Sequence, residues 1–153
     1  MKKTRILFVC LGNICRSPMA EMIFAALCEK AGCRERFEIA SAATSTEEIG
    51  NPVYPPARAE LTRRGVPLLP HRARQMQKSD YARYDLLIGM EESNLLRMRR
   101  ISGGDPEGKI RKLMDFTPGG GDVADPWYSG RFDIAYEDIA AGCAGLLEAL
   151  KQD

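Results

Sequence analysis

Short apolar runs alternate along the chain with segments of helical periodicity. Residues 6–9 and 85–90 are continuous apolar runs, which is typical of strands buried on both faces of a sheet. Weaker patterns at residues 37–41 and 110–114 predict two more strands. These four segments are the candidate sheet.

The segments between these strands carry apolar residues at helical spacing, which predicts amphipathic helices. The first has apolar residues at helical spacing, namely Ala20, Ile23, Phe24, Leu27 and Cys28, and Gly32 ends it. Turn residues predict a second helix at 57–64, and a third begins near Glu91 with an acidic first turn and a basic last turn. A final stripe comprises Ile139, Cys143, Leu146, Leu147 and Leu150.

Strands that alternate with helices predict an α/β fold in three layers, a doubly wound parallel sheet with helices on both faces. The 153 residues suit a single domain spanning 1–153, and no repeat or linker suggests a second one. In such folds ligands bind beyond the carboxyl ends of the strands. The loop after residues 6–9 is therefore the first place to look for chemistry.

Composition narrows the class of protein. A net charge of +1 gives no electrostatic footprint for nucleic acid, and no apolar run is long enough to predict a membrane span or signal peptide. The length and the charge suggest a monomer. Five cysteines, four of them near the N-terminus, favour free thiols in a reducing compartment, so we expect a cytoplasmic protein. With a single histidine, His71, we expect no metal site.

The loop itself reads V-C-L-G-N-I-C-R-S-P over residues 9–18. Cys10 and Arg16 can lie on opposite sides of a tight loop whose backbone N–H groups point at an anion. The helix N-terminus and Arg16 favour the Cys10 thiolate, so this loop can bind a phosphoryl group and attack it. Gly12 and Asn13 are the residue types that most easily adopt left-handed angles.

Ser17 has two candidate roles. With Pro18 at the first helical position, it is a good N-cap for the following helix. Its hydroxyl is also placed to stabilise the Cys10 sulfur when that sulfur leaves as a thiolate.

This run resembles the C-x-G-N-x-C-R-S signature of the low-molecular-weight protein tyrosine phosphatases. The resemblance implies a four-stranded sheet in the order 2-1-3-4 and hydrolysis of phosphotyrosine through a phosphocysteine, with no cofactor and no metal. It implies a phosphoprotein substrate, and a tyrosine kinase is a candidate partner. The implied phosphate-binding residues are Leu11, Gly12, Asn13, Ile14, Cys15, Arg16 and Ser17.

A phosphatase also needs an acid to protonate the leaving oxygen. Asp125, in the sequence D-P-W-Y, resembles the family's general acid, although a lone Asp-Pro is more typical of a surface turn. Trp127 and Tyr128 follow in a polar, glycine-flanked segment and are candidate substrate contacts, with pinning of the loop as the alternative. Glu47 is expected on the opposite rim, where many family members carry an aromatic residue.

The resemblance also implies supporting roles for residues that the sequence by itself does not single out. It implies that His71 and Ser41 hold Asn13 and Ser17 in place, whereas the sequence by itself suits an exposed loop histidine equally well. The chain departs from the family pattern at Ala43 and Glu91, where Gly and Asp are frequent.

Three other functions compete with this interpretation. A thioredoxin-coupled arsenate reductase needs further cysteines around residues 81–90, and none occurs there. Protein-arginine phosphatases typically carry Thr where this loop has Ile14. A catalytically idle phosphate-binding module does not need both Cys10 and Asp125. The sequence leaves open whether Cys15 captures an oxidised Cys10 as a protective disulfide or is an inert thiol.

Overall fold

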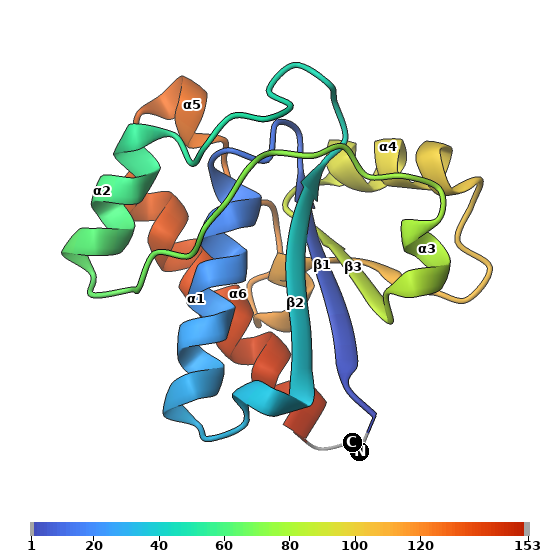
Figure 1. Cartoon of the computed structure of the whole chain (residues 1–153), viewed down its shortest axis with the longest axis horizontal. Helices are drawn as coiled ribbons and strands as arrows, with labels where there is room; N and C mark the ends of the chain where they lie inside the picture. The colour runs from blue at the N-terminus through green and yellow to red at the C-terminus, as the bar shows by residue number, and fades with distance from the viewer. Residues whose placement is uncertain (1, 152–153) are drawn as a thin grey trace.

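The computed structural model describes residues 2–151 and is built around a parallel sheet (Figure 1). The four strands follow the order β2-β1-β3-β4, which confirms the predicted topology. The strands are β1 Thr4–Cys10, β2 Phe37–Ala43, β3 Leu86–Gly89 and β4 Ile110–Lys112. The last is shorter than predicted because the chain turns at Leu113 into a 3₁₀ helix, η2 (Leu113–Phe116).

Helices connect and cover the strands. They are α1 Arg16–Lys30, the 3₁₀ helix η1 Arg34–Arg36, α2 Pro55–Arg63, α3 Asp80–Arg83, α4 Glu92–Ser102, α5 Pro126–Ser129 and α6 Phe132–Lys151. The four predicted helices correspond to α1, α2, α4 and α6. The single-turn helices α3 and α5 were not predicted, because one turn is too short to show a periodic stripe.

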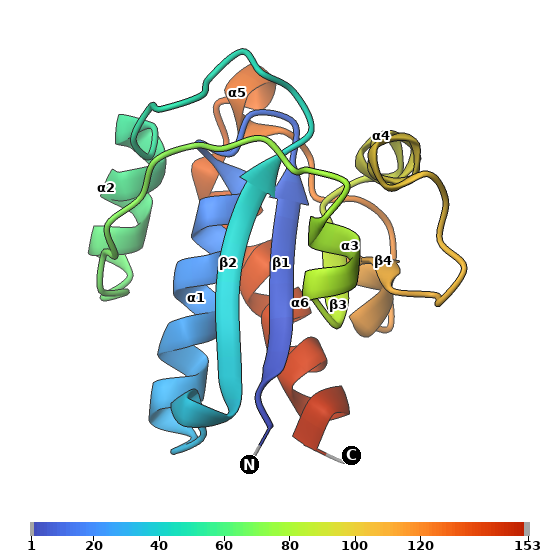
Figure 2. The same ribbon diagram turned by 45° about the vertical axis from the view of Figure 1, so that its right-hand side comes forward.

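Strand β1 is buried on both faces, as its continuous apolar sequence predicts. Ile6 and Phe8 belong to a core shared with α1, α2 and α6, whereas Leu7 and Val9 belong to a second core shared with α3 and α4. Figure 2 shows α3 and α4 on the opposite side of the sheet from α6. The three-layer architecture therefore follows from the alternation of side chains along a strand.

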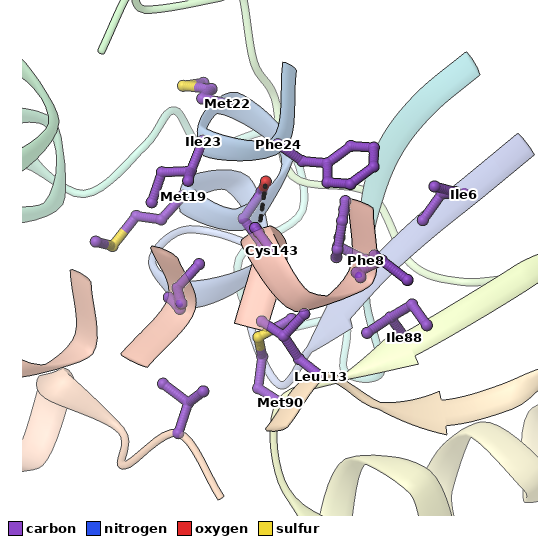
Figure 3. Packing of buried hydrophobic residues seen from close by; sticks show 14 of the residues in the cluster. Ile6, Phe8, Met19, Met22, Ile23, Phe24, Ile88, Met90, Leu113 and Cys143 are labelled. Atoms are coloured by element: carbon purple, nitrogen blue, oxygen red, sulfur yellow. Dashed lines mark hydrogen bonds between the residues drawn. The ribbon is translucent and has the colours of Figure 1, made fainter. Parts of the chain in front are cut away.

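The larger core is mostly aliphatic and includes the rings of Phe8, Phe24 and Phe37 (Figure 3). The rings of Phe8 and Phe24 lie 5.8 Å apart, and Leu113 contributes from η2. Helix α6 approaches η2 so closely that a Cβ on Gly145 would lie 1.9 Å from the Phe116 carbonyl oxygen. Within residues 2–151, no helix is long and apolar enough to cross a membrane.

The loops at the carboxyl edge of the sheet are hydrogen-bonded to one another. The Thr44 N–H after β2 donates to the Cys10 carbonyl at 2.9 Å, and the Val123 N–H donates to the Met90 carbonyl after β3, also at 2.9 Å. The segments that follow β1, β2 and β4 are thus brought to the edge where parallel α/β folds bind ligands.

Candidate active site

The segment between β1 and α1 forms a tight loop around the Cys10 sulfur. Asn13 adopts φ 60° and is the only non-glycine residue with a left-handed backbone within the described chain. The prediction was right for Asn13 and wrong for Gly12, which does not have a positive φ. A single left-handed residue is enough to curl the loop.

Ser17 does not cap helix α1, so that prediction was wrong. The helix begins one residue earlier, at Arg16, with Cys15 at the N-cap position and no side-chain cap. Pro18 consequently lies in the first turn but not at its first position, which proline still tolerates because the first-turn N–H groups have no intrahelical partner. Ser17 is instead fully buried beside Cys10.

The Cys10 sulfur receives three polar contacts. The backbone N–H groups of Asn13 and Ser17 donate to Sγ at 3.3 and 3.4 Å, and the Ser17 hydroxyl lies 3.0 Å from it. The sulfur thus lies at the centre of the loop, within reach of two backbone N–H groups and one hydroxyl. The Ser17 hydroxyl thus lies where its second expected role requires it, and that role stays a prediction.

A chain of buried side chains holds the loop. Asn13 donates through Nδ2 to the hydroxyls of Ser17 (2.8 Å) and Ser41 (3.0 Å), while its Oδ1 accepts from the backbone N–H of Arg74 (3.1 Å). Ser41 in turn donates to Glu21 at 2.6 Å, and burial raises the pKa of that carboxyl. Ser41 was implied by the resemblance, whereas Glu21 was missed because it lies in an ordinary helical pattern.

His71 contacts the same loop. Its Nε2 lies 2.7 Å from the Asn13 carbonyl oxygen, a geometry that makes Nε2–H the donor. The structure therefore supports the role implied by the resemblance over an exposed loop histidine.

Arg16 is buried, with only 2% of its side chain exposed. It donates to the Glu91 carboxylate and to the Val123 carbonyl, both at 2.9 Å. Burial opposes its charge, but the anionic Cys10, Asp125 and Glu91 together raise the pKa of Arg16 above its usual value. The guanidinium is thus held in a fixed orientation and charged. Glu91 and Val123 were missed as its partners, since nothing in their local sequence points to a residue 75 or more positions away.

Asp125 lies opposite Cys10 at the N-terminus of α5. Its Oδ1 accepts from the Trp127 N–H at 3.0 Å, and Pro126 occupies the first helical position, so the Asp-Pro pair is an N-cap motif. Its Oδ2 lies 3.3 Å from Arg16. Capping therefore fixes one carboxylate oxygen and directs the other at the phosphate loop.

A cavity of about 140 Å³ joins these groups. It is lined by Cys10, Leu11, Gly12, Asn13, Ile14, Cys15, Arg16, Ser45, Glu47, Glu48, Asp125, Trp127 and Tyr128. All the predicted site residues line it except Ser17, which lies behind the Cys10 sulfur. Ser45 and Glu48 are additional lining residues from the loop after β2.

Comparisons with known proteins identify the family of this chain. Residues 5–153 match the family model described as low molecular weight phosphotyrosine protein phosphatase. The chain belongs to this family. Over 97% of its length it is 36% identical to the low molecular weight protein-tyrosine-phosphatase YfkJ of Bacillus subtilis, which it covers to 96%. A human low molecular weight phosphotyrosine protein phosphatase is 38% identical over 94% of the chain, with 93% of the human protein covered.

Solved structures of low-molecular-weight phosphatases share the architecture. The crystal structure of YfkJ matches with a TM-score of 0.96 at 35% identity, covering 99% of this chain and 97% of that one. A structure named as a Drosophila arginine phosphatase matches with a TM-score of 0.87 at 28% identity, covering 100% and 99%. The chain is thus a phosphatase of the hydrolase class, and the neighbours include an enzyme named for a different phosphorylated residue.

The second cysteine of the phosphate loop, Cys15, has a thiol that is hard to ionise. Burial, followed by the charge of Cys10, raises the pKa of the Cys15 thiol from 9.0 to about 12. Cys15 is therefore protonated at neutral pH and a poor nucleophile. Across residues 2–151, all cysteines are free, and no three His, Cys, Asp or Glu side chains are grouped so as to hold a metal ion.

Proposed function

We propose that this phosphatase hydrolyses phosphotyrosine by two in-line displacements. The Cys10 thiolate attacks phosphorus, and the bond from phosphorus to the phenolic oxygen breaks. Asp125 gives its proton to that oxygen, so tyrosine leaves neutral. Water then attacks the phosphocysteine while the Asp125 carboxylate takes one of its protons, and inorganic phosphate leaves as the Cys10 thiolate is restored.

One observation carries this proposal: a nucleophile, a cation and an acid converge on a single small cavity. Cys10 and Arg16 come from the loop between β1 and α1 and Asp125 from a segment more than a hundred positions away, yet all three line it. Arg16 supplies a fixed positive charge for the equatorial phosphate oxygens, and a fixed charge stabilises a transition state without reorganisation. The contact between Ser17 and Sγ supports the departure of sulfur in the second step.

The cavity walls favour an aryl phosphate. Ile14 is an apolar, 8% exposed residue within the phosphate loop, and it offers no hydrogen bond to the guanidinium of a phosphoarginine. Trp127 presents a half-exposed ring that can stack on a phenyl group. Arsenate reduction is disfavoured because, among residues 2–151, Cys10 and Cys15 are the cysteines that line the cavity, and no further cysteine is placed there to relay a disulfide.

The cellular setting is part of the proposal. The buried free thiols support a reducing compartment, the cytoplasm. The substrate is a phosphotyrosine protein, with a tyrosine kinase as a candidate, and the enzyme acts as a monomer.

The test is a comparison of three substrates with one enzyme preparation. Turnover of an aryl phosphate, a phosphoarginine peptide and arsenate with thioredoxin is measured for the wild type and for Cys10→Ser. We expect the highest kcat/KM for the aryl phosphate and no turnover by the variant. A preference for phosphoarginine or for arsenate would contradict the substrate assignment while leaving Cys10 as the nucleophile.

A further inference from the structure

Helix α5, which carries the proposed acid, has little support of its own. It comprises only the four residues Pro126–Ser129, and Pro126 is its only buried residue. Gly121 precedes it with φ 89°, and Gly130 follows it with φ 72°. A helix this short is not stable in isolation, so contacts with the rest of the molecule must hold Asp125 over the phosphate loop.

The aromatic contact that α5 makes is with Tyr54. The Tyr54 and Trp127 ring centroids lie 4.7 Å apart at an interplanar angle of 48°. On another side, the Tyr54 ring lies 6.0 Å from that of Phe132, the first residue of α6. Tyr54 therefore packs between the acid-bearing helix and the start of α6; Figure 1 shows α5 next to the upper end of α2, the helix that follows Tyr54. Offset or tilted aromatic pairs at these separations are favourable.

The backbone of Tyr54 is hydrogen-bonded to the phosphate loop. Its N–H donates to the Ile14 carbonyl of the phosphate loop at 2.9 Å. One residue thus contacts the phosphate loop through its main chain, and its side chain packs both against the acid-bearing helix and against the small cluster that contains Ile14 and Cys15. A substitution at position 54 removes the ring and leaves the main-chain contact in place.

The Tyr54 side chain does not cap helix α2. Tyr54 is the N-cap residue of α2 but makes no side-chain cap. Pro55 and Pro56 follow and bring no N–H, and the Ala57 N–H already donates to the Tyr54 carbonyl at 2.9 Å. A capping side chain would find no free donor there, so the ring can be replaced without loss of a cap.

We propose that Tyr54 is a positioning residue that holds Trp127, and through it the Asp125 carboxylate, over the phosphate loop. This rests on the proposed function, in which Asp125 is the general acid. The link to Asp125 is direct, because the Trp127 N–H donates to Oδ1 of that carboxylate. The same packing orients the Trp127 ring along the cavity wall. No described residue hydrogen-bonds the Tyr54 hydroxyl, so the ring alone should carry the effect.

The test compares Tyr54→Ser with Tyr54→Phe, which keeps the ring. For each, kcat/KM is measured with an aryl phosphate that has a poor leaving group and with one whose activated phenol departs unprotonated. We expect Tyr54→Ser to lose about tenfold with the poor leaving group and much less with the activated one, because a misplaced acid matters only where a proton is needed. Tyr54→Phe should retain wild-type values for both.

Fluorescence supplies a readout that does not depend on activity. Trp127 is the only tryptophan, so its emission and its quenching by acrylamide report on this contact directly. We expect more quenching in Tyr54→Ser and none beyond the wild type in Tyr54→Phe. Unchanged quenching in Tyr54→Ser, or equal losses with both aryl phosphates, would overturn the proposal.

Asp125→Asn and the double variant separate this proposal from the function on which it rests. If Asp125→Asn shows the leaving-group dependence and Tyr54→Ser does not, only the role of Tyr54 is wrong. If Asp125→Asn itself shows none, Asp125 is not the acid, and the inference falls with it. Adding Tyr54→Ser to Asp125→Asn should cause no further loss that depends on the leaving group, because both changes act on one group.

Discussion

Replacing Asn13 by Ala should destabilise the protein strongly, because this residue holds the phosphate loop together. Asn13 is fully buried and its side chain makes three hydrogen bonds, to Ser17, Ser41 and the Arg74 backbone. At about 1 kcal/mol of net stability each, their loss amounts to about 3 kcal/mol. Alanine at φ 60° adds about 1 kcal/mol of backbone strain.

The expected total of about 4 kcal/mol is a large part of the 5–15 kcal/mol typical of a small domain. Urea denaturation followed by circular dichroism measures it as a shift of the midpoint at constant slope. Asn13→Gly loses the same bonds without the strain, so it should be about 1 kcal/mol more stable than Asn13→Ala. Asn51→Ala is the matched control, because Asn51 is exposed and makes one side-chain bond, to Glu48.

Both Asn13 variants should also bind inorganic phosphate more weakly, because the loop amides and the Ser17 hydroxyl lose their support. If Asn13→Ala unfolds at the same urea concentration as Asn51→Ala, the account of how this loop is held is wrong. If Asn13→Gly is no more stable than Asn13→Ala, the left-handed backbone carries no strain.

Four further predictions concern packing, ionisation, oxidation and the rim. Gly145→Ala should lower the free energy of unfolding by about 1–3 kcal/mol despite its better helix propensity, because its Cβ would meet the Phe116 carbonyl, and urea denaturation measures this. Stability should fall as pH rises from about 9 toward 12, because burial raises the pKa of the Cys15 thiol from 9.0 to about 12 and the folded state therefore holds a proton that the unfolded chain loses; the pKa of the buried Cys28 thiol is raised in the same way, so Cys15→Ala should flatten the profile only in part, and an unchanged profile would contradict the contribution of Cys15. After peroxide treatment, dithiothreitol should restore activity to the wild type but poorly to Cys15→Ser, because Cys15 lies in the same loop as Cys10 and that proximity offsets its weak nucleophilicity; full recovery of the variant would contradict a protective role. Substrate peptides with basic flanks should be preferred over those with acidic flanks at low salt, since Glu47 lines the rim; an unchanged preference in Glu47→Trp would contradict this.

The fold was predictable because its signals are local. Continuous apolar runs identified the buried strands, and stripes at helical spacing identified α1 and α6, the helices that cover one face of the sheet. The boundaries of η2 and α5 were not predictable, since a single turn has no period and its conformation depends on what it packs against.

The site residues that could be predicted are likewise those whose signal lies within a short stretch of sequence. Cys10, Arg16 and the residues between them are contiguous, so their spacing, together with the preceding strand and the Gly12-Asn13 pair, indicated an anion-binding loop. Asp125 was found from the Asp-Pro-aromatic pattern, and the structure shows why that pattern suits the position: the carboxyl caps α5 while Pro126 starts it.

Glu91 and Tyr54 lay beyond sequence reasoning. The pairing of Glu91 with Arg16 joins residues 75 positions apart, and sequence spacing carries no sign of it. Tyr54 precedes two prolines and read as part of a turn. Its contact with Trp127 exists only after α2 and α5 have been brought together at the same end of the molecule.

The central claim is that Cys10 carries the phosphoryl group during turnover. Asp125→Asn with an activated aryl phosphate should accumulate this species, because attack proceeds without the acid while hydrolysis lacks its base. Acid quenching followed by peptide mass spectrometry should find one phosphoryl group per protein, on the peptide that contains Cys10, and none in a variant that also carries Cys10→Ser. A phosphoryl group on another residue, or stoichiometric release of phenol with no covalent label, would contradict the mechanism.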